Sequence, residues 1–176
     1  MILTFKPCAS YCFRLPVFCL LAFAFMLYML SSCQYKKQAK MADTNAYAFR
    51  LTPGQDLKKE IQNLVNQKQI KAGWIGTCVG SLTKYNIRFA NQPNGSTDSG
   101  HFEIVSLTGT VSTNGSHLHI SISDSTGKTI GGHLMDSCII YTTAEIVILS
   151  SDDFIFRREK DGTTPWEELQ VEERRQ

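Results

Sequence analysis

The sequence contains few cysteines beyond its first residues. Of the six cysteines in 176 residues, four lie within residues 1–33, and only Cys78 and Cys138 follow. Small domains that depend on disulfides need a denser framework than one potential pair. An apolar core must therefore stabilise the fold, and the sequence leaves open whether these two thiols pair.

The chain also lacks an excess of positive charge after residue 45. The whole chain has 18 basic and 16 acidic side chains, and residues 1–45 contain five of the basic ones but only one of the acidic ones. The rest of the chain therefore has 13 basic and 15 acidic side chains. A nucleic-acid-binding protein needs a basic surface that displaces counterions from phosphates. This net acidic body makes DNA an unlikely partner.

The motifs of several enzyme classes are missing as well. The sequence has no glycine-rich phosphate loop, no serine nucleophile elbow and no internal repeat. With 43% hydrophobic residues, the chain is long enough for one ordinary core. We expect one domain over residues 46–160, preceded by a signal segment (1–33) and a linker (34–45) and followed by a C-terminal tail (161–176).

Three of the four histidines lie in one predicted β-hairpin. His117 and His119 alternate with apolar residues, so a strand would carry both imidazoles on its polar face. Residues 124–127 have the composition of a turn, with Gly127 in the left-handed position, and this register places His133 opposite His119. Because side chains that face each other across two strands are about 5 Å apart, the three rings could meet at one point.

Three neutral imidazoles with a fourth position left to water are the usual ligand set of a catalytic zinc site. Copper, nickel or iron would accept the same ligands, and a His-x-His on an exposed strand is also common as an ordinary polar face. We therefore predict His117, His119 and His133 as ligands of zinc or another divalent transition metal. Glu103 is the candidate proton-transfer group, with a solvated strand glutamate as the alternative interpretation.

The first 33 residues have the pattern of a secretory signal. Arg14 precedes an apolar run over residues 15–30, and the following Ser-Ser-Cys resembles the end of a bacterial lipobox. Cleavage before Cys33 and lipid attachment to its thiol would anchor the protein to a membrane of the bacterial cell envelope. The alternative is a cytoplasmic protein whose translation starts at Met41.

The body has the pattern of a sheet covered by one helix. Leu57, Ile61, Leu64 and Val65 form one apolar helix face, for which Thr52 is the predicted N-cap and Gln55 completes a capping box. Alternating or continuous apolar runs predict strands over residues 47–51, 74–79, 82–90, 101–111, 142–149 and 154–159.

Turns and loops separate these strands. Gly80-Ser81 and Asp136-Ser137 are predicted turns, and residues 91–100 are a predicted polar loop. Arg157-Arg158 is interpreted as a solvated charge pair on an edge strand.

Several short motifs resemble the plants and prokaryotes conserved (PPC) domain, and they occur in the right order. They are Gly-His-Phe-Glu-Ile-Val-Ser-Leu-Thr-Gly at 100–109, His-Leu-His at 117–119, Gly-Lys-Thr-Ile-Gly-Gly-His-Leu at 127–134 and Thr-Ala-Glu-Ile-Val at 143–147. The resemblance covers roughly residues 47–159. It implies an α+β fold, with a mostly antiparallel β-sheet and a packed helix, assembled as a homotrimer.

The resemblance also bears on function. Prokaryotic relatives imply a metal site at His117, His119 and His133. The wider fold group is similar to acetolactate decarboxylase and a zinc-dependent ester hydrolase, which implies hydrolase or lyase chemistry on a small carbonyl compound. Plant relatives contact DNA through an Arg-Gly-Arg-Pro segment that this sequence lacks. We therefore expect a metal-binding trimer, with a DNA-binding regulatory protein or a non-catalytic trimeric interaction module as alternatives.

Overall fold

The computed structural model describes residues 43–174, which belong to one compact unit. The expected signal segment and the lipidation site at Cys33 lie outside the described residues. The elements follow in the order β1 (Thr44–Leu51), α2 (Leu57–Gln67), β2 (Gly73–Arg88), β3 (Ser96–Ser112), β4 (Gly115–Ser123), β5 (Thr129–Leu134), β6 (Ile139–Ser151), β7 (Phe154–Glu159) and β8 (Glu168–Glu173). Among the described residues, no helix is long and apolar enough to cross a bilayer.

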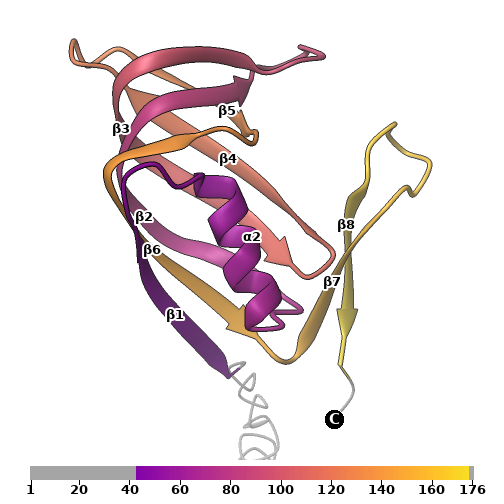
Figure 1. Ribbon diagram of the computed structural model, residues 1–176. Helices are drawn as coiled ribbons and strands as arrows, with labels where there is room; N and C mark the ends of the chain where they lie inside the picture. Colours follow the sequence, from indigo (N-terminus) through magenta and orange to yellow (C-terminus); the bar gives the residue numbers. More distant parts are fainter. Residues whose placement is uncertain (1–42, 175–176) are drawn as a thin grey trace, which may run out of the picture. The chain divides into compact units, whose positions relative to one another are not determined.

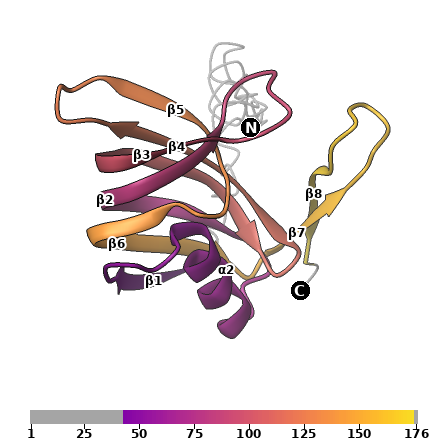
Figure 2. The same ribbon diagram turned by 45° about the horizontal axis from the view of Figure 1, so that its top comes forward.

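Six strands form one antiparallel sheet in the order β1-β6-β2-β3-β4-β5 (Figure 1). The end of β2 also pairs with β5, where Ile87 lies opposite Leu134 and Arg88 lies opposite His133. This extra pairing closes β2, β3, β4 and β5 into a ring. β7 and β8 form a separate two-stranded hairpin (Figure 2). The predicted α+β fold with a mostly antiparallel sheet is confirmed.

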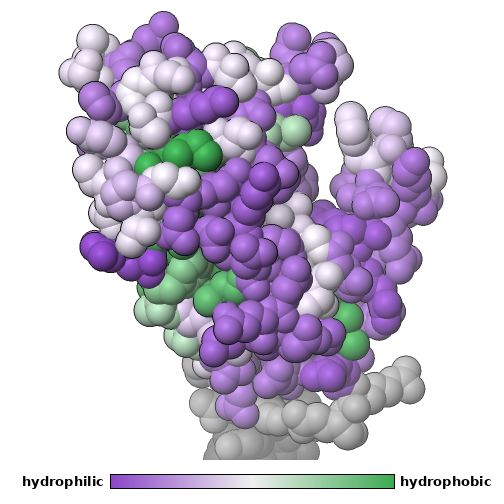
Figure 3. Space-filling view, in the orientation of Figure 1, coloured by the Kyte–Doolittle hydropathy of each residue, from purple (hydrophilic) through white to green (hydrophobic). Residues whose placement is uncertain are grey.

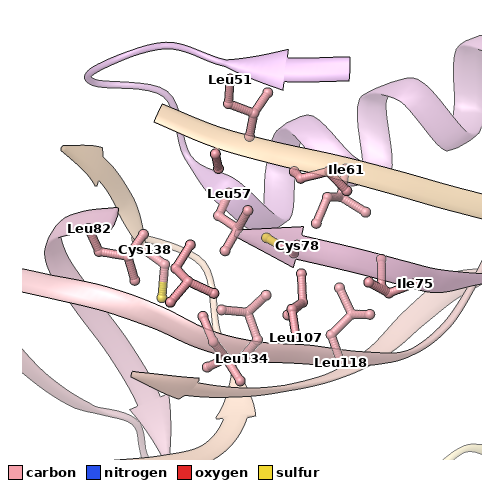
Figure 4. Close-up of a cluster of buried hydrophobic side chains, with 14 of the residues drawn as sticks. Leu51, Leu57, Ile61, Ile75, Cys78, Leu82, Leu107, Leu118, Leu134 and Cys138 are labelled. Atoms are coloured by element: carbon pink, nitrogen blue, oxygen red, sulfur yellow. The ribbon is translucent and has the colours of Figure 1, made fainter. Parts of the chain in front are cut away.

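Helix α2 packs on the sheet through one apolar stripe. Leu57, Ile61 and Val65 recur every four residues, lie on one side of the helix and are fully buried. Figure 4 shows Leu57 and Ile61 among core side chains from several strands, which include Leu51, Ile75, Leu107, Leu118 and Leu134. The face of the molecule seen in Figure 3 is mostly hydrophilic, with only small separate hydrophobic areas. The core therefore holds the sheet and the helix together, as the apolar pattern predicts.

The helix begins later than predicted. Its N-cap is Asp56, whose carboxylate accepts hydrogen bonds from the Lys58 and Lys59 amides. The expected Thr52–Gln55 contact does form, at 2.7 Å from the Thr52 amide to Gln55 Oε1, but it lies in the turn before the helix. Asp56 also accepts from the Ser137 amide at 2.7 Å. This contact with a distant loop favours Asp56 as the cap and is not visible in the local sequence.

Strand β2 is continuous, and the predicted turn at Gly80-Ser81 is wrong. Gly80 pairs with Ile104 of β3 and with Ala144 of β6. A Cβ atom at Gly80 would lie 2.1 Å from the Thr143 carbonyl oxygen. Glycine here permits a close backbone approach inside the sheet and does not mark a turn. Residues 96–100, predicted as loop, extend β3 because residues 96–99 pair with the end of β2.

The segment expected as a C-terminal tail contains strand β8. Strand β8 pairs with β7 along its whole length, from Phe154 opposite Glu173 to Glu159 opposite Glu168. Arg157 forms an ion pair with Glu172 at 2.9 Å, whereas Arg158 donates a part-buried hydrogen bond to Thr110 of β3. The interpretation of this arginine pair as a solvated edge is therefore wrong for Arg158.

Cys78 and Cys138 are both free and buried in the core. Burial raises the pKa of the Cys78 thiol to about 12 and that of Cys138 to about 11. Both side chains therefore stay protonated at neutral pH and act as small apolar core residues.

Gly109 sets how closely β3 approaches β4 behind the histidines. Its φ is 135°, and a Cβ atom there would lie 2.0 Å from the His117 carbonyl oxygen. We predict that Gly109→Ala lowers the free energy of unfolding by about 2–4 kcal/mol, measured by urea titration, because the two strands must separate. Gly127→Ala is the matched control. Its φ is also positive, at 81°, but no described atom lies within 4 Å, so the expected loss is about 1 kcal/mol. Equal losses in the two variants would contradict the close-approach explanation.

Candidate metal centre

The three predicted histidines lie together on the outer face of the β4–β5 hairpin. Leu118 and Ile120 of β4 point into the core, whereas His117 and His119 are exposed, as their alternation predicts. His119 lies directly opposite His133 in the register of β4 and β5. The predicted register of the hairpin is confirmed.

The ring nitrogens of these histidines converge. The ligand atoms that His117, His119 and His133 offer all lie within 4.8 Å of one another. The Nε2 atoms of His117 and His119 are 3.3 Å apart. Two nitrogens bound at 2.0–2.1 Å to one tetrahedral ion are about 3.3–3.4 Å apart. This pair therefore has the spacing of two ligands of one metal ion, and the ligand atom of His133 lies within 4.8 Å of both.

The environment of His133 also suits a metal ligand. Its Nδ1 atom is buried and has no hydrogen-bond partner among the described residues. A buried polar atom without a partner is rare in folded proteins, because it has lost its hydration without compensation. A metal-ligating ring normally uses both nitrogens, one toward the ion and one toward a hydrogen-bond acceptor. The donor set of three imidazoles therefore fits a divalent transition metal.

The electrostatic environment keeps two of the rings neutral. Burial, followed by the charges of His117 and Arg88, lowers the pKa of His133 to about 4. Partial desolvation by its neighbours also lowers the pKa of His117, although the ring keeps solvent contact, and the nearby Arg158 guanidinium adds to this effect. Because a metal ion binds the neutral imidazole, the rings of His117 and His133 are in the binding form at neutral pH.

Two arginines that the sequence analysis missed lie beside the histidines. Arg88 faces His133 across β2 and β5, and its guanidinium lies 5.2 Å from the centre of the Trp166 ring. Arg158 donates a hydrogen bond to Thr110 Oγ1, and Thr110 faces His117 across β3 and β4. Only the alternation that exposes Arg88 was visible in the sequence. The contact between β7 and the sheet had no local signal.

A cavity of about 650 Å³ lies between these arginines, His117, His133 and the β7–β8 hairpin. A volume of this size is within the usual range for small-molecule sites. Its lining includes His117, His133, Arg88, Arg158, Lys160 and Glu168.

The structure does not bring Glu103 to the histidines. Glu103 is exposed on β3 and faces Ser81 and Ser123. Ser123 lies four residues from His119 along β4, which is roughly 13 Å at about 3.3 Å per residue. Glu168 of β8 is closer, because it lines the same cavity as His117 and its charge acts on the pKa of His117. Nothing in the sequence marked Glu168.

Residues 38–152 match the family model of the Plants and Prokaryotes Conserved (PCC) domain. The chain is also 42% identical over 126 residues to the Bifunctional protein GlmU of two Synechococcus strains. This match covers 72% of the chain and 20% of those proteins, so the chain spans about a fifth of the length of the curated relatives it matches.

Solved structures give the same fold. A hypothetical protein from Salmonella enterica superposes with a TM-score of 0.74 at 38% identity, over 76% of this chain and 96% of that one. A metal-containing protein from Archaeoglobus fulgidus superposes with a TM-score of 0.63 at 23% identity, over 73% of this chain and 96% of that one. A candidate DNA-binding protein from Bacteroides thetaiotaomicron superposes with a TM-score of 0.62 at 24% identity, over 74% of this chain and 94% of that one.

The last two similarities concern the fold alone, because their sequence identity is low. The family model, by contrast, matches about two thirds of the chain, from before β1 to the end of β6. This protein therefore belongs to the Plants and Prokaryotes Conserved (PCC) domain family, also abbreviated PPC.

Proposed function

We propose that this PPC-domain protein holds one divalent metal ion, preferably zinc, through His117, His119 and His133. The observation that carries the proposal is the convergence of three imidazoles whose ligand atoms lie within 4.8 Å of one another. The metal-containing protein from Archaeoglobus fulgidus, which has the same fold, supports it.

The proposed reaction class is hydrolysis or lyase chemistry on a small carbonyl compound. When bound by three imidazoles, a divalent ion supplies Lewis-acid chemistry, which polarises a carbonyl or activates water. The β7–β8 hairpin shields one side of the site and forms the cavity in which a small molecule can lie. Glu168 is the carboxylate best placed to accept or return a proton there, and the role of Glu103 stays a prediction.

We also propose that the protein acts as a homotrimer. Val79 and Val105 are 56% and 57% exposed on the neighbouring strands β2 and β3, on the side opposite the buried core. Exposed valines on one sheet face are a surface that further copies of the chain could cover. A lipid anchor at Cys33 would keep this assembly at the cell envelope.

The metal site is tested by removing one ligand. We expect that the full chain, stripped with EDTA and reloaded, binds one zinc per chain by elemental analysis and calorimetry. His119→Ala should weaken zinc binding at least about 100-fold, because two imidazoles remain of three. His101→Ala is the matched control, since His101 packs against Tyr141 with 4.3 Å between ring centres and is not in the cluster. Equal zinc content in the two variants would refute the site.

The lowered histidine pKa values predict how the stability of the metal-free protein depends on pH. In the unfolded chain the ring of His133 takes up its proton near pH 6.5, but in the folded chain only near pH 4. Between these values the unfolded state binds more protons, so the free energy of unfolding falls as the pH decreases from about 6.5 to 4. His117 acts in the same direction.

We expect the melting temperature in EDTA to fall over this pH range. The fall should be smaller in His133→Gln, whose side chain does not titrate. His101→Gln serves as the control and should keep the full slope. Parallel curves for all three proteins would show that His133 does not cause the pH dependence.

DNA binding is the second candidate function that we propose. The candidate DNA-binding protein from Bacteroides thetaiotaomicron, which shares the fold, favours it. The charge distribution disfavours it, because the chain after residue 45 carries 13 basic and 15 acidic side chains. Arg88 and Arg158 also line a cavity and do not form an extended basic stripe.

Salt dependence separates the two functions. Binding of a short DNA duplex is measured by fluorescence anisotropy at 50 and 200 mM salt. If the metal-site proposal is correct, we expect no affinity tighter than about 10⁻⁴ M at the higher salt, which is the weak end of non-specific binding. Micromolar binding that is lost in Arg88→Met would support the DNA candidate instead.

A further inference from the structure

We propose that the cavity beside the three histidines binds a small carboxylate, whose negative charge is recognised by Arg88 and Arg158. This inference deepens the proposed function and rests on it for the reaction, because it names the chemical class of the carbonyl substrate. It goes beyond the metal site, since it assigns a binding role to two residues on β2 and β7.

The strand registers place each arginine beside a different histidine. Arg88 lies opposite His133 in the β2–β5 pairing, so the two side chains are on the same face of the sheet. Arg158 reaches the sheet from β7 and donates to Thr110 Oγ1, and Thr110 lies opposite His117. Both guanidinium groups therefore border the same cavity as the imidazoles.

Neither arginine forms an ion pair closer than 4.0 Å with a described carboxylate. Within residues 43–174, the ion pairs closer than 4.0 Å join Lys58 to Asp136 and Arg157 to Glu172. Arg158 is half-buried with one hydrogen bond to a threonine, and burial lowers its pKa even though the charge of Glu168 acts in the opposite direction. A partly desolvated cation with no carboxylate at ion-pair distance is costly, and an anion in the cavity would reduce that cost.

The guanidinium groups are held in place and still have free donors. Arg88 lies over the face of Trp166, which orients its planar group and leaves its N–H edges open. Arg158 uses one N–H on Thr110, and an arginine has five. Two positioned guanidinium groups with unused N–H donors match the planar pair of oxygens in a carboxylate.

The charge of the cavity favours an anion over a neutral molecule. Its lining holds the cations Arg88, Arg158 and Lys160 and the carboxylates Glu167 and Glu168, which leaves one net positive charge when the histidines are neutral. A divalent ion on the histidines would add to this positive charge. The choice of a carboxylate over a phosphate therefore rests on the planar pair of oxygens that the two guanidinium groups match.

The test measures equilibrium binding of pyruvate, which carries a carboxylate next to a carbonyl group. Calorimetric titrations use the zinc-loaded full chain, with acetate, inorganic phosphate and acetone as comparison probes. We expect pyruvate and acetate to bind and acetone not to bind. Arg158→Met and Arg88→Met should each weaken pyruvate binding by about 10- to 100-fold, with unchanged zinc content.

Arg157→Met is the matched control. It removes the same charge from the adjacent residue of β7, but Arg157 is paired with Glu172 and does not line the cavity. Its pyruvate affinity should equal that of the unsubstituted protein. Circular dichroism shows whether Arg158→Met folds. If it does not, Arg158→Lys replaces it, because lysine keeps the positive charge but lacks the planar guanidinium group with its paired N–H donors.

Titrations of EDTA-treated protein separate this inference from the proposed function. Failure to bind zinc would refute the metal site, yet a loss of pyruvate binding in the arginine variants would still support the carboxylate site. Conversely, normal zinc binding combined with unchanged pyruvate affinity in Arg88→Met and Arg158→Met would overturn the inference alone. It would also be overturned if acetone bound as tightly as pyruvate, if phosphate bound and pyruvate did not, or if no pyruvate bound at about 50 mM.

Discussion

The pairing of His119 with His133 across β4 and β5 is the constraint on which the site depends. In an antiparallel sheet, facing residues put their side chains on the same side, and their separation is set by the backbone hydrogen bonds. A shift of this pairing by one residue would turn one of the two imidazoles into the core. The buried residues Leu118, Ile120 and Ile122 prevent that shift, because it would expose them to water. The apolar core therefore fixes the positions of the histidines.

The pairing of β2 with β5 positions a charged residue in the same way, because strand register decides which residue faces His133. This pairing brings Arg88 opposite His133, although they are 45 positions apart in the chain. The β7–β8 hairpin adds Arg158, Trp166 and Glu168 from the other side. A flat β4–β5 hairpin would offer three rings without charged neighbours, whereas the closed sheet and the second hairpin place a cavity with charged side chains beside His117 and His133. A site of this kind can select a ligand by charge as well as bind a metal ion.

The function inferred from these features is specific to the site and not to the fold. The PPC fold occurs here with a metal-containing and a candidate DNA-binding neighbour, so membership in the family leaves the activity open. The imidazoles, the two arginines that form no ion pair closer than 4.0 Å and the cavity between them favour small-molecule chemistry. Glu168 takes the position beside the histidines that the sequence analysis had assigned to Glu103, because β8 folds back on β7.

The sequence by itself determined the features that depend on residues close together in the chain. Alternation predicted β4 with its two outward imidazoles, turn composition predicted the β4–β5 register, and the apolar stripe Leu57, Ile61 and Val65 predicted the covering helix. Tertiary structure alone decided which distant residues meet: Asp56 with Ser137, Gly80 with the β6 backbone, Arg88 with His133, and Arg158 with Thr110. The physical reason is that period and turn chemistry are local properties, whereas strand order and hairpin docking follow from burial of the whole core.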